Sequence, residues 1–249
     1  MTVHVRTGGT DGPALVLLHG LGATGGVWLD AARAWPGAWL VPDLPGHGRS
    51  APLAGCSFDA LAAALAPVVP VDRPVAVLGH SLGGVVALAL GSGRFGPAVD
   101  VVCGLGIKVR WTEQELAKAG ELAGRPSKVF PSREEAAERA LKVAGLWGLV
   151  PSDSPLVDDA LVETSEGWRL ALDPAAYGVG APDMAALVAA SRARVVLAAG
   201  ERDPMCPPEH LLAVDPGGVV LPGVGHNAHV EEPDALVPLL TRLHASLVG

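Results

Sequence analysis

Residues 78–84 read "LGHSLGG" and place a serine, Ser81, between two glycines, Gly79 and Gly83. A short apolar run precedes this stretch and a longer one follows it, as expected for a buried strand and then a helix. Because glycine has no Cβ, a strand and a helix joined here can approach closely. The stretch therefore predicts a tight turn that projects Ser81 at the helix N-terminus. The same letters also fit an ordinary strand-to-helix turn, so the motif alone does not make Ser81 a nucleophile.

The sequence around this turn alternates between buried strands and helices. Its apolar runs are short, largely continuous and rich in β-branched residues, as in parallel strands covered on both faces. This alternation predicts the α/β fold class, with a mostly parallel sheet between two layers of helices. The predicted strands are residues 14–18, 38–42, 75–79, 99–106, 193–200 and 217–223, and the predicted helices are residues 26–34, 58–66, 82–90 and 233–246.

The alternation breaks in the middle of the chain, where we predict polar helices and no strand. Thr112 with Glu115, and Ser132 with Glu135, have the spacing of a helix capping box. We therefore expect a helical insertion, residues 112–177, within one α/β core. That core would comprise residues 1–111 and 178–249.

Composition excludes several classes of protein. The chain has 249 residues, of which 49% are hydrophobic and 18% charged, so it is long and apolar enough to bury a core. Its formal net charge of −8 argues against nucleic acid or an anionic membrane as a partner. No signal peptide or membrane-spanning run is apparent, and the 3 cysteines have unrelated spacings. We expect a cytoplasmic protein with a small-molecule substrate, and leave open whether it is a monomer or a homodimer.

A serine acts as a nucleophile only with a base and an acid that orients the base. Asp203 follows one late predicted strand, and His226 follows the next. The carboxyl ends of parallel strands meet at one edge of the sheet, where ligands bind in open α/β folds. We therefore expect Ser81, Asp203 and His226 at this same edge, in the chain order of a serine nucleophile, an acid and a base.

Five motifs together resemble those of the α/β-hydrolase superfamily, over nearly the whole chain. They are "HGLG" at 19–22, "DLPGHGRS" at 43–50, "GHSLGG" at 79–84, "GERD" at 200–203 and "GVGHNAHVEEPDAL" at 223–236. One departure concerns the first strand. Only the segment "TVHVR" precedes the strand at 14–18, whereas family members usually open with more strands. The resemblance thus implies an α/β-hydrolase fold with about seven strands in place of the usual eight.

The resemblance also implies roles for single residues. Ser81 would be the nucleophile, Asp203 the acid and His226 the base. The backbone N–H groups of Leu21 and Leu82 would form the oxyanion hole. The helical insertion would be the family's cap, which shapes the substrate pocket.

Other side chains compete for these positions. His229 lies shortly after His226, but His226 directly follows the strand and a glycine, so we favour His226 as the base. Glu201 lies nearer its strand than Asp203 does, and we expect it to be solvated. Asp183 is expected to cap a helix. The histidines for which we expect structural roles are His19, His47 and His80.

No metal or nucleotide motif is present in the sequence. It lacks H-E-x-x-H and H-x-x-E-H, and its cysteines do not cluster with histidines. Its glycine-rich loops lack the Lys-Ser/Thr of a phosphate-binding loop. We therefore expect no metal and no cofactor.

A serine at the nucleophile position favours acyl transfer. We expect a serine hydrolase that cleaves a carboxylic ester, thioester or lactone of a largely apolar small molecule through an acyl-enzyme. One alternative is a cofactor-free lyase or cyclase in which the His–Asp pair transfers protons. A ligand-binding receptor on the same fold is a further alternative.

Large apolar residues of the insertion and of nearby loops are the candidates for the substrate pocket, although core packing would explain several of them. The candidates for substrate binding are Trp28, Ile107, Trp111, Trp147, Trp168 and Met205, with Leu149 and Tyr177 as further pocket residues. Lys108 and Arg110 could contact an anionic group, or could be solvated charges at the base of the insertion.

Overall fold

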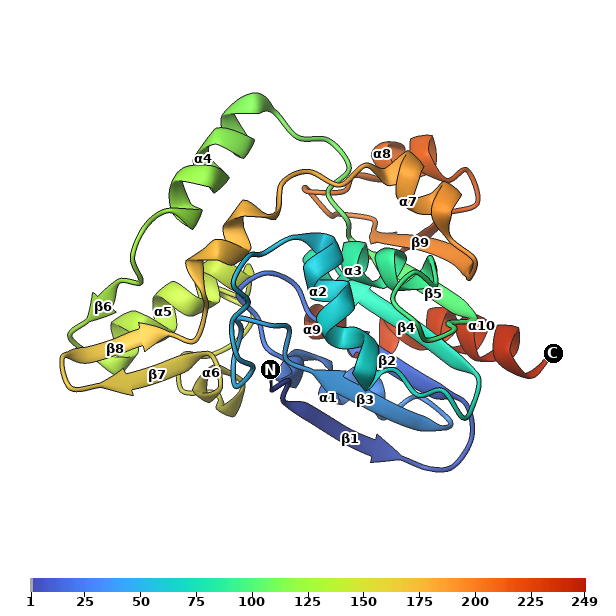
Figure 1. Cartoon of the computed structure of the whole chain (residues 1–249), viewed down its shortest axis with the longest axis horizontal. Helices are drawn as coiled ribbons and strands as arrows, with labels where there is room; N and C mark the ends of the chain where they lie inside the picture. The colour runs from blue at the N-terminus through green and yellow to red at the C-terminus, as the bar shows by residue number, and fades with distance from the viewer. Residues whose placement is uncertain (1) are drawn as a thin grey trace.

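The computed structural model describes residues 2–249 and contains a seven-stranded sheet with the strand order β1-β3-β2-β4-β5-β9-β10 (Figure 1). The first strand pairs antiparallel with its neighbour, and all other pairs are parallel. The α/β fold class and the expected number of strands are thus confirmed. The strands are β1 (Val5–Gly9), β2 (Ala14–Leu18), β3 (Ala38–Pro42), β4 (Val75–His80), β5 (Val101–Leu105), β9 (Arg194–Gly200) and β10 (Val219–Leu221).

Helices cover both faces of the sheet because its strands bury side chains on both. In β2, Leu15 and Leu17 belong to one hydrophobic cluster, whereas Val16 and Leu18 belong to the other. The helices of the first cluster include α1 (Leu29–Ala32), α9 (Ala228–Glu231) and α10 (Val237–Val248), together with two helices of the chain between β5 and β9. Those of the second are α2 (Phe58–Leu65), α3 (Leu82–Gly91), α7 (Met184–Ala190) and α8 (Pro208–Val214). None of the helices within residues 2–249 is long and apolar enough to cross a membrane.

The edge strand β1 begins later than expected. The expected first strand covered residues 2–6, but β1 is Val5–Gly9 and pairs with the whole of β3. A Cβ at Gly8 would lie 2.2 Å from Cζ2 of Trp39, so the indole of Trp39 packs directly over the glycine backbone. This close packing allows two glycines to continue a strand that their low β-propensity argues against.

The segment between β5 and β9, residues 106–193, is here called the insertion, and it is not purely helical. Three short strands form a separate antiparallel sheet in the order β6-β8-β7 (Figure 1). The expectation of no strand in this region is therefore wrong. The elements before α7 are α4 (Glu113–Ala123), β6 (Val129–Phe130), α5 (Arg133–Ala144), α6 (Pro155–Asp158), β7 (Leu161–Thr164), β8 (Gly167–Leu170) and the 3-10 helix η3 (Pro174–Val179).

Local hydrogen bonds explain where these elements begin and turn. The capping box at Thr112 is complete, because its side chain and that of Glu115 each accept a hydrogen bond from the other residue's backbone. Ser132 and Asp183 likewise accept a backbone N–H at the start of α5 and of α7. In the β7–β8 hairpin, Thr164 Oγ1 lies 2.8 Å from the carbonyl oxygen of Gly167 and closes the turn.

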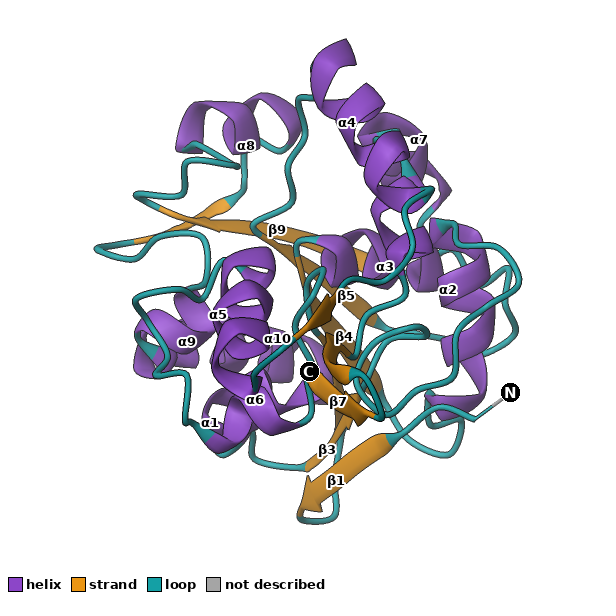
Figure 2. Cartoon of the chain, turned by 90° about the vertical axis from the view of Figure 1, so that its left-hand side faces the viewer, coloured by secondary structure: helices purple, strands orange, loops and turns teal. Residues whose placement is uncertain are grey.

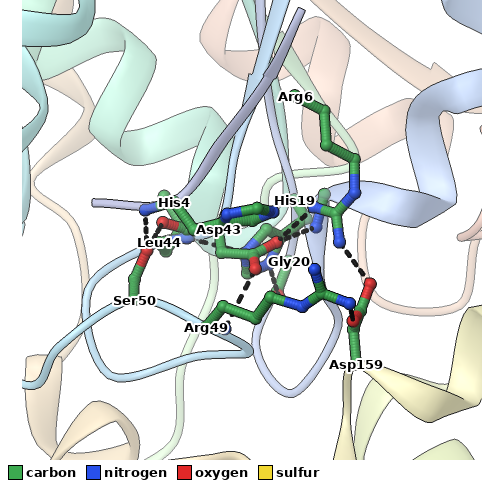
Figure 3. Close-up of polar contacts among 10 residues, drawn as sticks. His4, Arg6, His19, Gly20, Asp43, Leu44, Arg49, Ser50 and Asp159 are labelled. Atoms are coloured by element: carbon green, nitrogen blue, oxygen red, sulfur yellow. Dashed lines mark hydrogen bonds and ion pairs between the residues drawn. The ribbon is translucent and has the colours of Figure 1, made fainter. Parts of the chain in front are cut away.

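A buried carboxylate ties the first strand to the loop after β3 and to the insertion (Figure 3). Asp43 Oδ1 accepts hydrogen bonds from Arg6 Nη1 at 3.0 Å and from Gly25 N at 2.8 Å, and Oδ2 accepts from Arg49 N at 3.0 Å. Arg6 and Arg49 also pair with Asp159, which directly follows α6. Burial opposes ionisation of Asp43, but these N–H donors and the nearby charges lower its pKa below the usual value. The network fixes the base of the loops beside the Ser81 turn.

Candidate active site

Ser81 lies in a strained turn between β4 and α3. It is the only non-glycine residue of the described chain with a positive φ, 50°, and its ψ is −114°. A Cβ at Gly79 would lie 2.0 Å from the carbonyl oxygen of Gly83, and a Cβ at Gly83 would lie 2.4 Å from that of Leu18. Glycine is therefore required at both positions, as the sequence motif predicted. The ordinary-turn interpretation does not explain why the strained residue is a serine.

Asp203 and His226 form a hydrogen-bonded pair across two loops. His226 Nδ1 lies 2.9 Å from Asp203 Oδ2, in the loops that follow β10 and β9. The other carboxylate oxygen of Asp203 accepts hydrogen bonds from Met205 N at 2.8 Å and Cys206 N at 3.0 Å. The Asp203 side chain is fully buried, whereas that of His226 is 14% exposed. The carboxylate is thus fixed in place, and the second ring nitrogen of His226 remains available toward the cavity.

Ser81 and His226 line one cavity, with a volume of about 630 Å³, between the sheet edge and the insertion. Leu21 and Leu82 line the same cavity. Leu82 is the first residue of α3, so its N–H has no helical carbonyl to bond. A Cβ at Gly20 would lie 3.5 Å from Ser81 Cβ, which places the turn before Leu21 directly beside the serine.

The backbone around His226 is fixed from several sides. Gly225 N and Asn227 N, on either side of His226, donate to Glu231 at 2.6 Å and 3.0 Å. The Nε2 atom of His80 lies 2.9 Å from the carbonyl oxygen of His226. The Asn227 side chain donates to Gly145 O at 3.0 Å and so joins this loop to the insertion. Sequence reasoning missed Glu231, because spacing alone does not show that a side chain folds back onto its own loop.

The competing residues lie elsewhere. His229 is buried and stacks on Trp28 with ring centroids 4.2 Å apart, and burial lowers its pKa to about 3. Glu201 is exposed and accepts a hydrogen bond from Gly223 N at 2.9 Å. Burial also lowers the pKa of His80 well below the usual value. These rings remain neutral at pH 7, and none of these residues takes the place of Asp203 or His226 in the pair.

Two further histidines lie in the loops beside the site. His19 Nε2 accepts a hydrogen bond from Leu44 N at 2.8 Å, and the His47 ring meets it edge-on with centroids 5.1 Å apart. Burial lowers the pKa of His19 to about 4 and that of His47 to about 3. Both rings are neutral at pH 7 and have structural contacts, and a structural role is what the sequence predicted.

The cavity lining is mainly apolar and comes from both the core and the insertion. Ile107, Trp111, Met205 and Tyr177 line it, as expected from the sequence. Sequence reasoning missed further apolar residues of the lining. These include Phe58, Val85, Leu116, Leu122, Val143 and Val179.

Three tryptophans expected at the pocket lie outside the cavity. Trp28 is fully buried beneath His229 and cannot reach a ligand. Trp147 is 52% exposed, with Lys142 Nζ 4.9 Å from its ring, and its neighbour Leu149 is 45% exposed. Trp168 lies on β8 opposite Phe130 and packs on the core. The sequence shows that these residues are large and apolar. It does not show whether such a side chain packs in the core, lies at the surface or contacts a ligand.

Most of the charge at the cavity is paired within the protein: Lys142 pairs with Glu138, whereas Lys118 has no ion-pair partner within residues 2–249. Lys108 lines the cavity, forms an ion pair with Glu115, and its Nζ lies 4.8 Å from the Trp111 ring. The pKa of the Glu115 carboxyl falls to about 2, chiefly through its hydrogen bond with Lys108. Arg110 is exposed and outside the lining. Within residues 2–249, no cluster of His, Cys, Asp and Glu is arranged to hold a metal ion.

The fold and the site together define a class of protein. The model of the Alpha/beta hydrolase family matches residues 15–239 of the chain. The chain therefore belongs to the alpha/beta hydrolase family and is a hydrolytic enzyme.

Among known proteins, the chain is similar to lipase LipV of Mycobacterium tuberculosis, with 34% identity over 181 residues, which is 68% of this chain and 67% of the lipase. It is also similar to a pimeloyl-acyl-carrier protein methyl ester esterase of Methylococcus capsulatus, with 37% identity over 110 residues. That match covers 42% of this chain and 41% of the esterase.

Among solved structures, the chain resembles the thioesterase domain from the curacin biosynthetic pathway, with a TM-score of 0.76 and 21% identity. The superposition covers 96% of this chain and 94% of that domain, so the same fold extends over almost the whole chain.

Proposed function

We propose that this protein is a serine hydrolase that cleaves an ester or thioester of a largely apolar small molecule through an acyl-enzyme. The observation that carries the proposal is the hydrogen-bonded Asp203–His226 pair, which shares one mainly apolar cavity with a serine held at positive φ. The similarity to a lipase and to a methyl ester esterase supports ester cleavage. The insertion would act as a cap, because Trp111, Leu116 and Tyr177 close the cavity from that side.

The geometry suggests a role for each residue. Ser81 Oγ would attack the substrate carbonyl while His226 takes its proton. Asp203 holds the Nδ1 proton of His226, and so fixes the tautomer that presents the other nitrogen to the serine. The N–H groups of Leu21 and Leu82 would donate to the developing oxyanion, a contribution of about 3 kcal/mol per donor. Water activated by His226 would then release the acid.

Two substitutions test the proposal against proton-transfer chemistry. Ser81→Ala and His226→Ala are compared with the wild type on a panel of esters, thioesters and lactones. Acyl transfer predicts that both variants lose at least about 10⁴-fold in kcat/KM, because the two side chains act as one unit. Ser165→Ala, at the exposed tip of the β7–β8 hairpin, is the matched control and should remain active.

The other classes of function predict different results. A lyase or cyclase would need the Asp203–His226 pair but not a covalent bond to Ser81. In that case Ser81→Ala would retain most of the activity that His226→Ala abolishes. A receptor would show no turnover of any compound in the panel.

A further inference from the structure

A second hollow, with a volume of about 340 Å³, lies in the insertion next to the catalytic cavity. Leu122 of α4 and Tyr177 of η3 line both spaces, and so form a shared wall. The hollow otherwise lies among α4, β6, α5 and β8, which occupy the side of the molecule away from the C-terminus (Figure 1). The two spaces are therefore adjacent, with the side chains of Leu122 and Tyr177 at the boundary between them.

The second hollow is lined by cations. Arg125, Lys128 and Arg139 contribute to its walls, and none of the described residues that line it is acidic. We call these three residues and their apolar surround the basic groove. Its positive lining is unusual in a chain whose formal net charge is −8.

The cations of the basic groove are weakly neutralised by the protein itself. Arg125 lies 3.6 Å from Glu121 in an exposed pair, which is a loose contact. The Nζ atom of Lys128 lies 4.7 Å from the ring of Phe130, and no carboxylate of the described chain pairs with it. Arg139 also has no ion-pair partner within residues 2–249. At the catalytic cavity, Lys108 and Lys142 have their own carboxylates, Glu115 and Glu138, and Lys118 has none within residues 2–249.

Arg139 also affects Tyr177, which lies at the boundary between the two spaces. Burial raises the pKa of the Tyr177 phenol, while the nearby Arg139 charge acts in the opposite direction. Arg139 and Tyr177 line the same hollow, so the guanidinium faces the space that this boundary residue also faces. A guanidinium can bind a carboxylate or phosphate through two parallel hydrogen bonds, which a neutral end group does not accept as well.

We propose that the basic groove binds an anionic group at the far end of the substrate whose ester or thioester bond lies at Ser81. The substrate class is thus an elongated acyl compound with an apolar middle and an anionic end, such as a carboxylate. This inference rests on the proposed hydrolase function and adds to it a determinant of specificity outside the catalytic cavity.

Matched pairs of esters test this inference. One series consists of monomethyl esters of straight-chain dicarboxylic acids, here called half esters, which keep one free carboxylate. The other consists of methyl esters of monocarboxylic acids with the same chain lengths, which are neutral. In the wild type, kcat/KM should favour the half esters once the chain is long enough to reach the groove, and this preference should weaken as salt is added. Short pairs should show no preference.

Arg139→Gln should lower kcat/KM for the long half esters by about tenfold, because one charge-assisted contact is lost. It should leave the neutral esters unchanged. Arg169→Gln is the matched control, since Arg169 is an exposed cation of β8 that does not line the groove. Equal effects of Arg139→Gln on both series, or the same loss in Arg169→Gln, would overturn the inference.

A binding measurement separates this inference from the hydrolase proposal. Ser81→Ala protein is titrated by calorimetry with the longest half ester, with and without the Arg139→Gln substitution. Weaker binding in the double variant supports the groove even if turnover is slow, whereas equal binding, or none, contradicts it. Conversely, one outcome is that hydrolysis of short neutral esters requires Ser81 while the enzyme shows no preference for long half esters. That result would support the hydrolase proposal and contradict the proposed role of the basic groove.

Discussion

The sheet edge that carries Ser81 and the insertion above it are packed in different ways. At the sheet edge, backbone atoms approach so closely that a Cβ at Gly79 would lie 2.0 Å from a carbonyl oxygen. In the insertion, none of the residues of α4, Glu113–Ala123, is buried, and Figure 2 shows this helix projecting from the rest of the molecule. The chemistry therefore depends on a closely packed part of the protein, and one wall of the cavity depends on a lightly packed helix.

This difference predicts two kinds of mutational effect. Changes at the sheet edge should reduce kcat for every substrate, because they disturb groups that contact the reacting atoms. Changes in the insertion should alter KM for some substrates only, because they disturb the contacts that recognise the rest of the molecule.

The largest effect is expected at Asp203. Asp203→Asn should lower kcat by about 10⁴-fold, because the amide cannot hold His226 in the required tautomer. Steady-state kinetics and a thermal melt measure activity and folding separately. Glu201→Gln is the control and should remain active. If Asp203→Asn stays active until Glu201 is also replaced, Asp203 is not the acid.

A pH effect on stability is expected next, and its histidine part belongs to the core, since residues 106–193 contain no histidine. Burial lowers the pKa of His19 to about 4, and that of His47 and His229 to about 3, from 6.5. Below pH 6.5 the unfolded chain binds protons that the folded chain does not, so stability falls as the pH falls toward about 4. Each ring contributes about 1.4 kcal/mol per pH unit.

Urea unfolding between pH 7 and pH 4 measures this slope. His229→Phe keeps a ring against Trp28 and removes one titrating group, whose Nδ1 has no hydrogen-bond partner. The slope of this variant should be shallower by about 1.4 kcal/mol per pH unit. An unchanged slope would show that His229 does not remain neutral in the folded state.

A smaller effect is expected at Glu231, which holds the backbone on both sides of His226. Glu231→Gln should lower kcat by about tenfold, since two charge-assisted hydrogen bonds are weakened and the ring loses alignment. KM should stay the same, and a shift in the pH profile of kcat would separate positioning from a general loss of stability. Glu232→Gln, at the exposed neighbour, is the control. A change in KM alone would contradict this role.

The smallest effect is expected in the insertion. Leu116 lines the cavity from α4, and Leu116→Ala should raise KM for long acyl esters by about fivefold through lost apolar contact. Turnover of a short ester should not change. Gln114→Ala, an exposed residue of the same helix outside the lining, serves as the control. An equal loss of kcat on short and long esters would show that the two regions are not separable in this way.

The same contrast explains what could be predicted from the sequence. At the sheet edge, close backbone approach and burial each restrict which residue types can occur. Ser81 is flanked by glycines because backbones meet there, and Asp203 and His226 follow strands whose apolar runs are continuous. Fold class and the approach of these three residues therefore follow from local patterns combined with the parallel sheet, whereas the expected strand count followed from the resemblance to a family.

The insertion could not be predicted to the same extent. Strands β7 and β8 are short, half-exposed and joined by a turn without Asn-Gly or Asp-Gly, so the pattern around Gly167 did not indicate a hairpin. Trp147 and Trp168 have the residue type of a pocket wall, but Trp147 is exposed and Trp168 packs on the core, because residue type does not set which side chains meet a ligand.

The central claim, that Ser81 is the nucleophile, is tested most directly by covalent labelling. The wild type and Ser81→Ala are treated with a fluorophosphonate probe, and the modified peptide is identified by mass spectrometry. We predict stoichiometric labelling of the wild type at Ser81 and no labelling of Ser81→Ala. Equal labelling of both proteins, or no labelling of folded wild type, would contradict the account.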